Sequence, residues 1–255
     1  MIHVKYAASN PGGAPTLILA ASLGTDREMW REQVLLLPSA WNVVTFDLRG
    51  HGASPLTSRI PTIDDFADDV VSIADDLGVD RFAFCGLSIG GAIGQSLGAR
   101  YPDRVSSLVL ASTGLTILTR AALIERSERV LREGTAWIAD ASAPRWFTER
   151  FRDEHPDIVD AKMDHLRHMA PRAYADACLA LAGFDGHAIA RSISVPTLVL
   201  SGEDDVATPP SGCAELAAAI PGAKLGSLPG SAHLCSVERP ELFTEFVQRH
   251  VEAHH

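Results

Sequence analysis

The sequence predicts an α/β fold with a mostly parallel central sheet and helices on both of its faces. Short runs of β-forming residues alternate with longer stretches of helical periodicity, the order typical of βαβ units. Several of the short runs are apolar throughout, as strands covered on both faces are. The chain has 255 residues, which is enough to bury one core of this kind.

The expected strands are short and separated by helices. They are placed at residues 2–7, 16–21, 42–46, 81–85, 106–111, 195–201 and 223–228. Helices are expected near residues 29–37, 62–77, 89–101, 211–219 and 240–251. Each assignment follows from the period of the apolar residues, which is two along a strand and about 3.6 along a helix.

One region interrupts this alternation. Residues 115–185 show no strand pattern and contain helical stretches at 120–133, 157–169 and 171–182. Pro144, Pro156 and Pro171 lie where helices of this region are expected to break. We therefore predict a helical cap, residues 115–185, inserted into a core made of residues 1–114 and 186–255. The alternative is an ordinary run of crossover helices in the same layer.

Composition excludes several classes of function. The formal net charge of -10 argues against nucleic acid, which proteins bind mainly through Lys and Arg. No apolar run approaches the ~20 residues that span a bilayer, so no membrane partner is expected. The N-terminal residues lack the pattern of a secretory signal. Four scattered cysteines are too few for a disulfide framework or a zinc site, and a cytoplasmic location is expected.

The candidate nucleophile is Ser88. It lies in a G-x-S-x-G pattern, with Gly86 and Gly90 around it, directly after an expected strand and before an apolar helix. A strand, a sharp turn and a helix form the context in which this motif presents a nucleophilic serine in the α/β-hydrolase fold. The alternative is a glycine-rich helix start that binds phosphate, but no lysine follows as a phosphate loop requires.

In this fold the catalytic acid and then the histidine follow the serine along the chain. Three adjacent acids, Glu203-Asp204-Asp205, come just after the strand at 195–201. We choose Asp205 to orient the histidine and keep Asp204 as the rival. His233 lies in a loop of small residues after the strand at 223–228, and its imidazole is the candidate general base.

A serine hydrolase also needs two N–H groups that point at the oxyanion. One is expected from the backbone of Ile89, the residue after the nucleophile. The other is expected from the backbone of Leu23, in the loop after the strand at 16–21. These are main-chain roles, so the side chains at these positions carry little direct information.

Several segments together resemble the 3-oxoadipate enol-lactonases. They are Ser22-Leu23-Gly24-Thr25-Asp26, Asp47-Leu48-Arg49-Gly50-His51-Gly52, Cys85-Gly86-Leu87-Ser88-Ile89-Gly90-Gly91, Arg145-Trp146-Phe147-Thr148, Asp205-Val206-Ala207-Thr208-Pro209-Pro210 and Ala232-His233-Leu234. The likeness runs from about residue 15 to residue 245. It implies hydrolysis of a five-membered enol-lactone to 3-oxoadipate, in the β-ketoadipate pathway of aromatic degradation, with no cofactor and no metal. Ala21 and Cys235 depart from the family pattern, and we expect both at the pocket.

The substrate implied by this resemblance is a small anion, so a protein of net charge -10 needs a local cation to bind it. Residues 115–185 hold ten of the 22 Lys and Arg residues, nine of them Arg. An arginine fork binds a carboxylate through two hydrogen bonds. We expect Arg145 to bind the carboxylate and Trp146 to pack on the flat ring. The alternative for Arg145 is a solvated helix face.

Two other functions stay open. One is a different esterase or lactonase, or a cofactor-free perhydrolase, of the same fold. The other is a ligand-binding protein that has kept the fold without catalysis. The sequence does not determine the oligomeric state.

Overall fold

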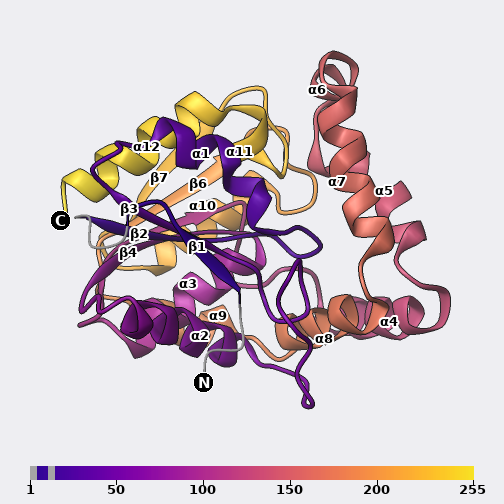
Figure 1. The fold of residues 1–255 in the computed structure, drawn as a ribbon, viewed down its shortest axis with the longest axis horizontal. Coiled ribbons are helices and arrows are strands. Elements are labelled where there is room, and N and C mark those ends of the chain that lie inside the picture. The colour runs from indigo at the N-terminus through magenta and orange to yellow at the C-terminus, as the bar shows by residue number, and fades with distance from the viewer. Residues whose placement is uncertain (1–4, 11–14) are drawn as a thin grey trace.

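A seven-stranded sheet forms the centre of the computed structural model, which describes residues 5–10 and 15–255 (Figure 1). Its strands are β1 (Tyr6–Ala8), β2 (Thr16–Ala20), β3 (Asn42–Phe46), β4 (Phe82–Leu87), β5 (Val105–Ala111), β6 (Thr197–Gly202) and β7 (Lys224–Leu228). Their order across the sheet is β1-β3-β2-β4-β5-β6-β7. Only β1 runs antiparallel to its neighbour. The predicted α/β-hydrolase fold, with its mostly parallel sheet, is confirmed. Residues 2–4 of the first expected strand lie outside the described residues.

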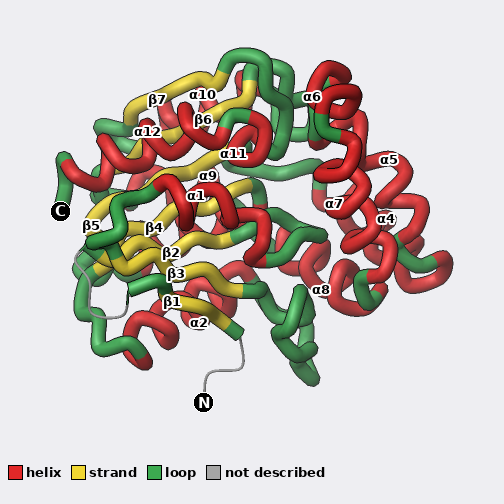
Figure 2. The backbone as a smooth tube through the Cα atoms, turned by 45° about the horizontal axis from the view of Figure 1, so that its top comes forward, coloured by secondary structure: helices red, strands yellow, loops and turns green. Residues whose placement is uncertain are grey.

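Burial explains why the strands could be recognised from their composition. Every residue of β2 to β6 is buried, because helices cover both faces of the sheet (Figure 2). The strand β7 lies at one edge and is mostly exposed. Hydrophobic runs therefore mark the inner strands, and the edge strands carry a weaker signal.

The helices of the core lie on the two faces of this sheet (Figure 1). On one face α1 (Arg31–Leu36), which follows the 3-10 turn η1 (Arg27–Trp30), packs against α12 (Pro240–Glu252). On the other, α2 (Ile63–Asp76) packs against α3 (Ile89–Arg100). The remaining core elements are α9 (Gly186–Ile189), η2 (Ala190–Ser192), α10 (Pro210–Ala219) and α11 (Cys235–Glu238). No helix among the described residues is both long and apolar enough to cross a membrane.

Five helices between β5 and β6 stand to one side of the sheet (Figure 1), and we call them the cap helices. They are α4 (Arg120–Glu133), α5 (Ala136–Trp146), α6 (Glu149–Glu154), α7 (Pro156–His168) and α8 (Pro171–Ala182). Within them α4 packs on α8, and α5 packs on α7. The expectation for Pro144 is wrong, since it lies inside α5, whereas Pro156 and Pro171 begin α7 and α8. The domain limits at 114/115 and 185/186 stay a prediction.

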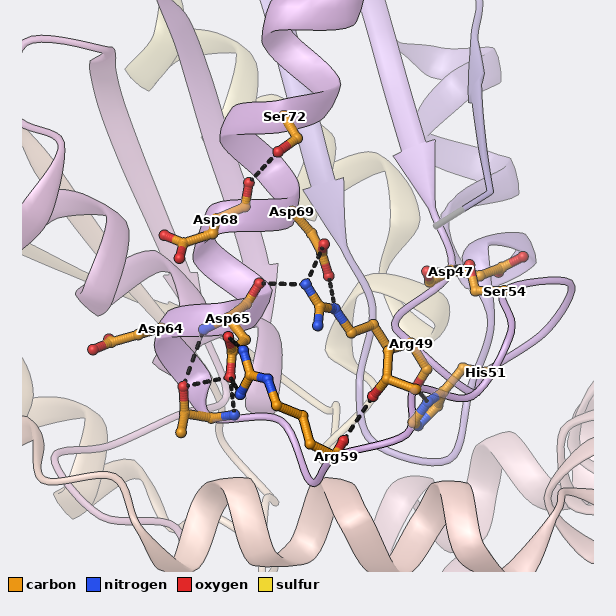
Figure 3. Close-up of polar contacts among 12 residues, drawn as sticks. Asp47, Arg49, His51, Ser54, Arg59, Asp64, Asp65, Asp68, Asp69 and Ser72 are labelled. Carbon is orange, nitrogen blue, oxygen red and sulfur yellow. Dashed lines mark hydrogen bonds and ion pairs between the residues drawn. The ribbon is translucent and has the colours of Figure 1, made fainter. Parts of the chain in front are cut away.

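A network of charged side chains joins the loop after β3 to helix α2 (Figure 3). Arg49 donates to Asp69 from Nε at 2.5 Å and from a terminal nitrogen at 2.7 Å, and both side chains are largely buried. Asp47 accepts from the N–H groups of Arg27 at 2.8 Å and Ala53 at 3.0 Å. Asp47 thus ties the loop after β2, where Leu23 lies, to the loop after β3.

We expect Asp69→Asn to lower the free energy of unfolding by about 3 kcal/mol, because the nearly buried Arg49 guanidinium loses the charge that compensates it. Chemical denaturation measures this loss. Arg59→Gln is the control, since it breaks a pair with Asp65 in which the arginine is exposed, and water screens such pairs. A loss with Arg59→Gln as large as that with Asp69→Asn would contradict the prediction.

Candidate active site

Ser88 occupies the sharp turn between β4 and α3. Its backbone has φ 60° and ψ -115°, a conformation that is rare for a residue with a side chain and costs about 1–3 kcal/mol. Its N–H donates to the carbonyl of Ala111 at 2.9 Å, and its carbonyl accepts from the hydroxyl of Thr113 at 3.0 Å. The end of strand β5 and the loop after it therefore hold the N–H and the carbonyl of Ser88.

Two glycines make this turn possible. A Cβ atom at position 86 would lie 2.0 Å from the carbonyl oxygen of Gly90. A Cβ at position 90 would lie 2.4 Å from the carbonyl oxygen of Ala20 on β2. Both contacts are impossible and both partners are backbone atoms, so only glycine fits at these positions. The pattern predicted from the sequence thus has a steric cause in the structure.

His233 and Asp205 form a buried pair. The Nδ1 atom of His233 lies 2.8 Å from Oδ2 of Asp205, and the two residues are 4% and 3% exposed. The other carboxylate oxygen of Asp205 accepts from the N–H groups of Ala207 at 2.8 Å and Thr208 at 2.9 Å. Asp204, the rival, is exposed to solvent. With the Nδ1 proton held by the carboxylate, Nε2 of His233 remains free to accept a proton.

One small cavity brings the candidate residues together. Ser88, His233 and Leu23 line it from the core, and Arg145 and Trp146 line it from the cap. Its volume of about 60 Å³ is far below the ~300–1,000 Å³ of pockets for drug-sized ligands. A larger groove of about 580 Å³ between α1, α7 and α12 contains neither Ser88 nor His233. The chemistry of the lining, rather than size, therefore identifies the candidate site.

Of the two expected oxyanion donors, Leu23 lines the cavity and Ile89 directly follows Ser88 in the chain. Ile89 is the first residue of α3, where the N–H groups have no partner within the helix and the helix dipole favours negative charge. The turn after β2 is held by Thr25, which donates to the Ser22 carbonyl through its N–H at 3.1 Å and its hydroxyl at 2.8 Å. Within the described part of the chain, the N–H groups of Leu23 and Ile89 donate no hydrogen bond.

Sequence reasoning missed Arg126. This residue of α4 lines the cavity together with Arg145 and Tyr174. Burial raises the pKa of the Tyr174 hydroxyl, so this side chain stays neutral. Among the residues that the structure describes, neither arginine forms an ion pair with a carboxylate. Two guanidinium groups are thus available to an anion in the cavity.

A model of the alpha/beta hydrolase fold matches residues 15–240 of the chain. The chain belongs to the alpha/beta hydrolase family. As a member of this family it is 33% identical to 3-oxoadipate enol-lactonase 2 of Acinetobacter baylyi over 247 residues, which are 97% of this chain and 92% of that protein. The crystal structure of the enol-lactonase from Burkholderia xenovorans LB400 is similar at 35% identity, with a TM-score of 0.94 over 98% of this chain and 96% of that one.

A further relative of this alpha/beta hydrolase comes from Klebsiella variicola and is named "Putative carbamate hydrolase RutD". It is 31% identical over 254 residues, which are 95% of this chain and 93% of that protein. Enol-lactones and carbamates both carry a carbonyl group that a nucleophile can attack. Membership of the family therefore supports a hydrolase that acts on a small ester or lactone. The residues that line the cavity determine which substrate it accepts.

Other candidates in this hydrolase lie outside the cavity. Ala21 and Cys235 are buried and neither lines it, so the expectation that both lie at the pocket is wrong. Both side chains belong to the packed core instead. Burial lowers the pKa of His51 to about 4, so its imidazole stays neutral in the turn after β3. In the described ranges, no three His, Cys, Asp or Glu side chains are placed to hold a metal ion.

Proposed function

We propose that this protein hydrolyses 3-oxoadipate enol-lactone, or a lactone of closely similar shape and charge, to the open acid. One observation carries the proposal: Ser88 and the Asp205-bound His233 line one small cavity with two arginines that have no carboxylate partner among the described residues. The substrate pairs a reactive lactone carbonyl with a carboxylate a few bonds away, and the cavity pairs a nucleophile with guanidinium groups. The likeness to two enol-lactonases supports the same choice.

In the proposed reaction the Ser88 hydroxyl attacks the lactone carbonyl carbon while Nε2 of His233 takes its proton. The N–H groups of Leu23 and Ile89 stabilise the oxyanion, and each donor contributes about 3 kcal/mol to lowering the barrier. The ring C–O bond then breaks and the enolate leaves; it takes up the proton that His233 received from Ser88 and becomes the ketone, which leaves His233 neutral again. Water, deprotonated by His233, attacks the acyl group and releases the acid, and the proton returns to Ser88.

The substrate is recognised by charge and shape. We propose that Arg145 binds the carboxylate, with Arg126 beside it, and that Trp146 packs on the flat lactone ring. Arg145 is the principal partner in this proposal, because it directly precedes Trp146, which also lines the cavity. A charge-assisted hydrogen bond contributes about 1.5–3 kcal/mol, which is about 10- to 100-fold in binding.

The proposal is tested by comparing kcat/KM for chemically prepared 3-oxoadipate enol-lactone, p-nitrophenyl acetate and a neutral carbamate. We expect the enol-lactone to exceed both neutral substrates by at least about 10-fold, the lower limit for one charged contact. A preference for the carbamate would assign the protein the activity that its Klebsiella relative is named for. Equal rates on the ester and the enol-lactone would favour a general esterase.

We expect Arg145→Gln to raise KM for the enol-lactone by about 10- to 100-fold, because one charge-assisted contact is lost. The rate on neutral p-nitrophenyl acetate should stay within about twofold. Arg150→Gln is the matched control, since Arg150 is an exposed cap arginine that pairs with Glu154 and does not line the cavity. If Arg145→Gln slowed both substrates equally, the arginine would have a structural role and no part in recognition.

A further inference from the structure

Glu238 is a buried carboxylate placed between the cap helices and the loop that carries His233. It lies at the end of α11 and is 8% exposed. Its Oε1 atom accepts from the N–H of Thr148 at 2.9 Å and from the hydroxyl of the same residue at 2.7 Å. Its Oε2 atom accepts from the N–H of Ala232 at 2.5 Å. One side chain therefore holds two segments far apart in the sequence.

A second contact joins the same two segments. The N–H of Leu234 donates to the carbonyl of Trp146, the last residue of α5, at 3.0 Å. The residues on either side of His233 are thus both held through residues 146–148 of the cap, Leu234 directly and Ala232 through Glu238. Trp146 also lines the cavity. The same contacts therefore hold both the proposed general base and the predicted substrate-binding segment. We call Glu238 and its three hydrogen bonds the anchor.

The chemistry of this anchor favours a carboxylate. Burial raises the pKa of Glu238 and its three hydrogen bonds lower it, so the contacts offset part of the cost of burying the charge. All three contacts are donated to Glu238, and an ionised carboxylate can accept them all because its two oxygens carry four lone-pair sites. Glu238 does not line the cavity of Ser88 but the larger groove between α1, α7 and α12, so its effect on Ser88 and His233 passes through the residues it holds.

We propose that Glu238 is a positioning residue that sets the place of His233 relative to the cap. This inference rests on the proposed role of His233 as the base. Transfer of the Ser88 proton requires the imidazole within hydrogen-bond distance of the hydroxyl, and a displacement of about 1 Å can cost about 100-fold in rate. The bond from Glu238 to Ala232 restrains the residue directly before that imidazole.

Five variants test the proposal, with two readouts that do not require Arg145. The first readout is the rate at which a fluorophosphonate labels Ser88, and the second is the turnover of p-nitrophenyl acetate. In Glu238→Gln the side chain keeps one acceptor oxygen and gains an NH2 group, which faces a donor and breaks at least one contact. We expect this variant to lower both the labelling rate and kcat by about 10- to 100-fold, with KM within about threefold.

The cap side of the anchor is tested at Thr148, which does not line the cavity. Thr148→Val removes the hydroxyl and should lower kcat by about 10-fold, whereas Thr148→Ser keeps it and should restore the wild-type rate within about threefold. Thr148 also caps α6 through the N–H of Phe151, so Thr119→Val, which removes the equivalent cap of α4, is the control. We expect Thr119→Val to leave kcat within about threefold of wild type.

Each outcome decides for or against the proposal. Wild-type rates in both Glu238→Gln and Thr148→Val would overturn it, and so would equal losses in Thr148→Val and Thr119→Val. A double variant, Glu238→Gln with Thr148→Val, should be no slower than Glu238→Gln alone, because both changes break one linkage. If the fluorophosphonate did not label the wild-type protein, the proposed function would be wrong and this inference would fail with it. If it labelled the wild-type protein and the variants at the same rate, only this inference would fail.

Discussion

Replacing Ser88 with alanine is expected to lower kcat for the enol-lactone by about 10⁴- to 10⁶-fold, because no other group replaces the nucleophile of the proposed acyl-enzyme. The strained turn should persist in the variant, since Gly86 and Gly90 still provide the space that it needs. The oxyanion N–H groups also remain, so residual turnover above that in water is expected. Steady-state kinetics on the purified variant measures the loss.

The control for this experiment is Ser96→Ala on the same helix, α3. Ser96 donates to Asp64 at 2.6 Å and does not line the cavity, so its loss should leave kcat within about twofold. A fluorophosphonate should label Ser96→Ala and leave Ser88→Ala unlabelled. Retention of near-wild-type kcat in Ser88→Ala would show that another residue attacks the substrate, and the proposed reaction would then be wrong.

Asp205→Asn is expected to lower kcat by about 10⁴-fold. One oxygen of Asp205 accepts from the N–H groups of Ala207 and Thr208, and an asparagine would keep its carbonyl oxygen there. Its NH2 group would then face Nδ1 of His233. A donor in this place leaves Nδ1 without its proton and puts the proton on Nε2, so the imidazole can no longer accept from Ser88. Turnover of p-nitrophenyl acetate checks the effect without any dependence on the anionic substrate.

Asp204→Asn provides the matched control, because it makes the same chemical change one residue earlier in the same loop. Asp204 is exposed, and its contact with this part of the site is a backbone bond from its N–H to the carbonyl of Ser231 at 2.9 Å. We expect kcat within about twofold of wild type. Equal losses in the two variants would mean that the acidic loop acts through its net charge, and that neither side chain has a specific role.

Most of the fold could be predicted because local patterns and burial agree. The inner strands are buried on both faces and rich in apolar residues, so their positions could be recognised from composition. Thr62 caps the start of helix α2: its hydroxyl accepts from the N–H of Asp65 while the Asp65 carboxylate accepts from the N–H of Thr62. Helix α5 was not predicted. It contains Pro144, and its many alanines leave it with little hydrophobic periodicity. Its stability comes from packing against α7.

Some residues of the candidate site could likewise be predicted from local patterns, and others could not. Ser88 was recognisable because its turn requires glycines at two fixed positions. His233 and Asp205 were recognisable from their order along the chain, although the choice between Asp205 and Asp204 depended on which carboxylate turns inward. Arg126 had no local signal. It lies on a helix with several other arginines, and only the packing of α4 on α8 places it beside Tyr174.

By itself the sequence determined the alternation of strands and helices, the glycine-flanked turn around Ser88 and the order of the acid and the histidine. These features depend on residues that are close together in the sequence, because local steric contacts and the period of the hydrophobic residues are determined within short segments. Only the tertiary structure decided which arginines face the cavity and that Glu238 joins Thr148 to Ala232. Contacts between residues 90 positions apart depend on how whole helices pack, and no local pattern encodes that.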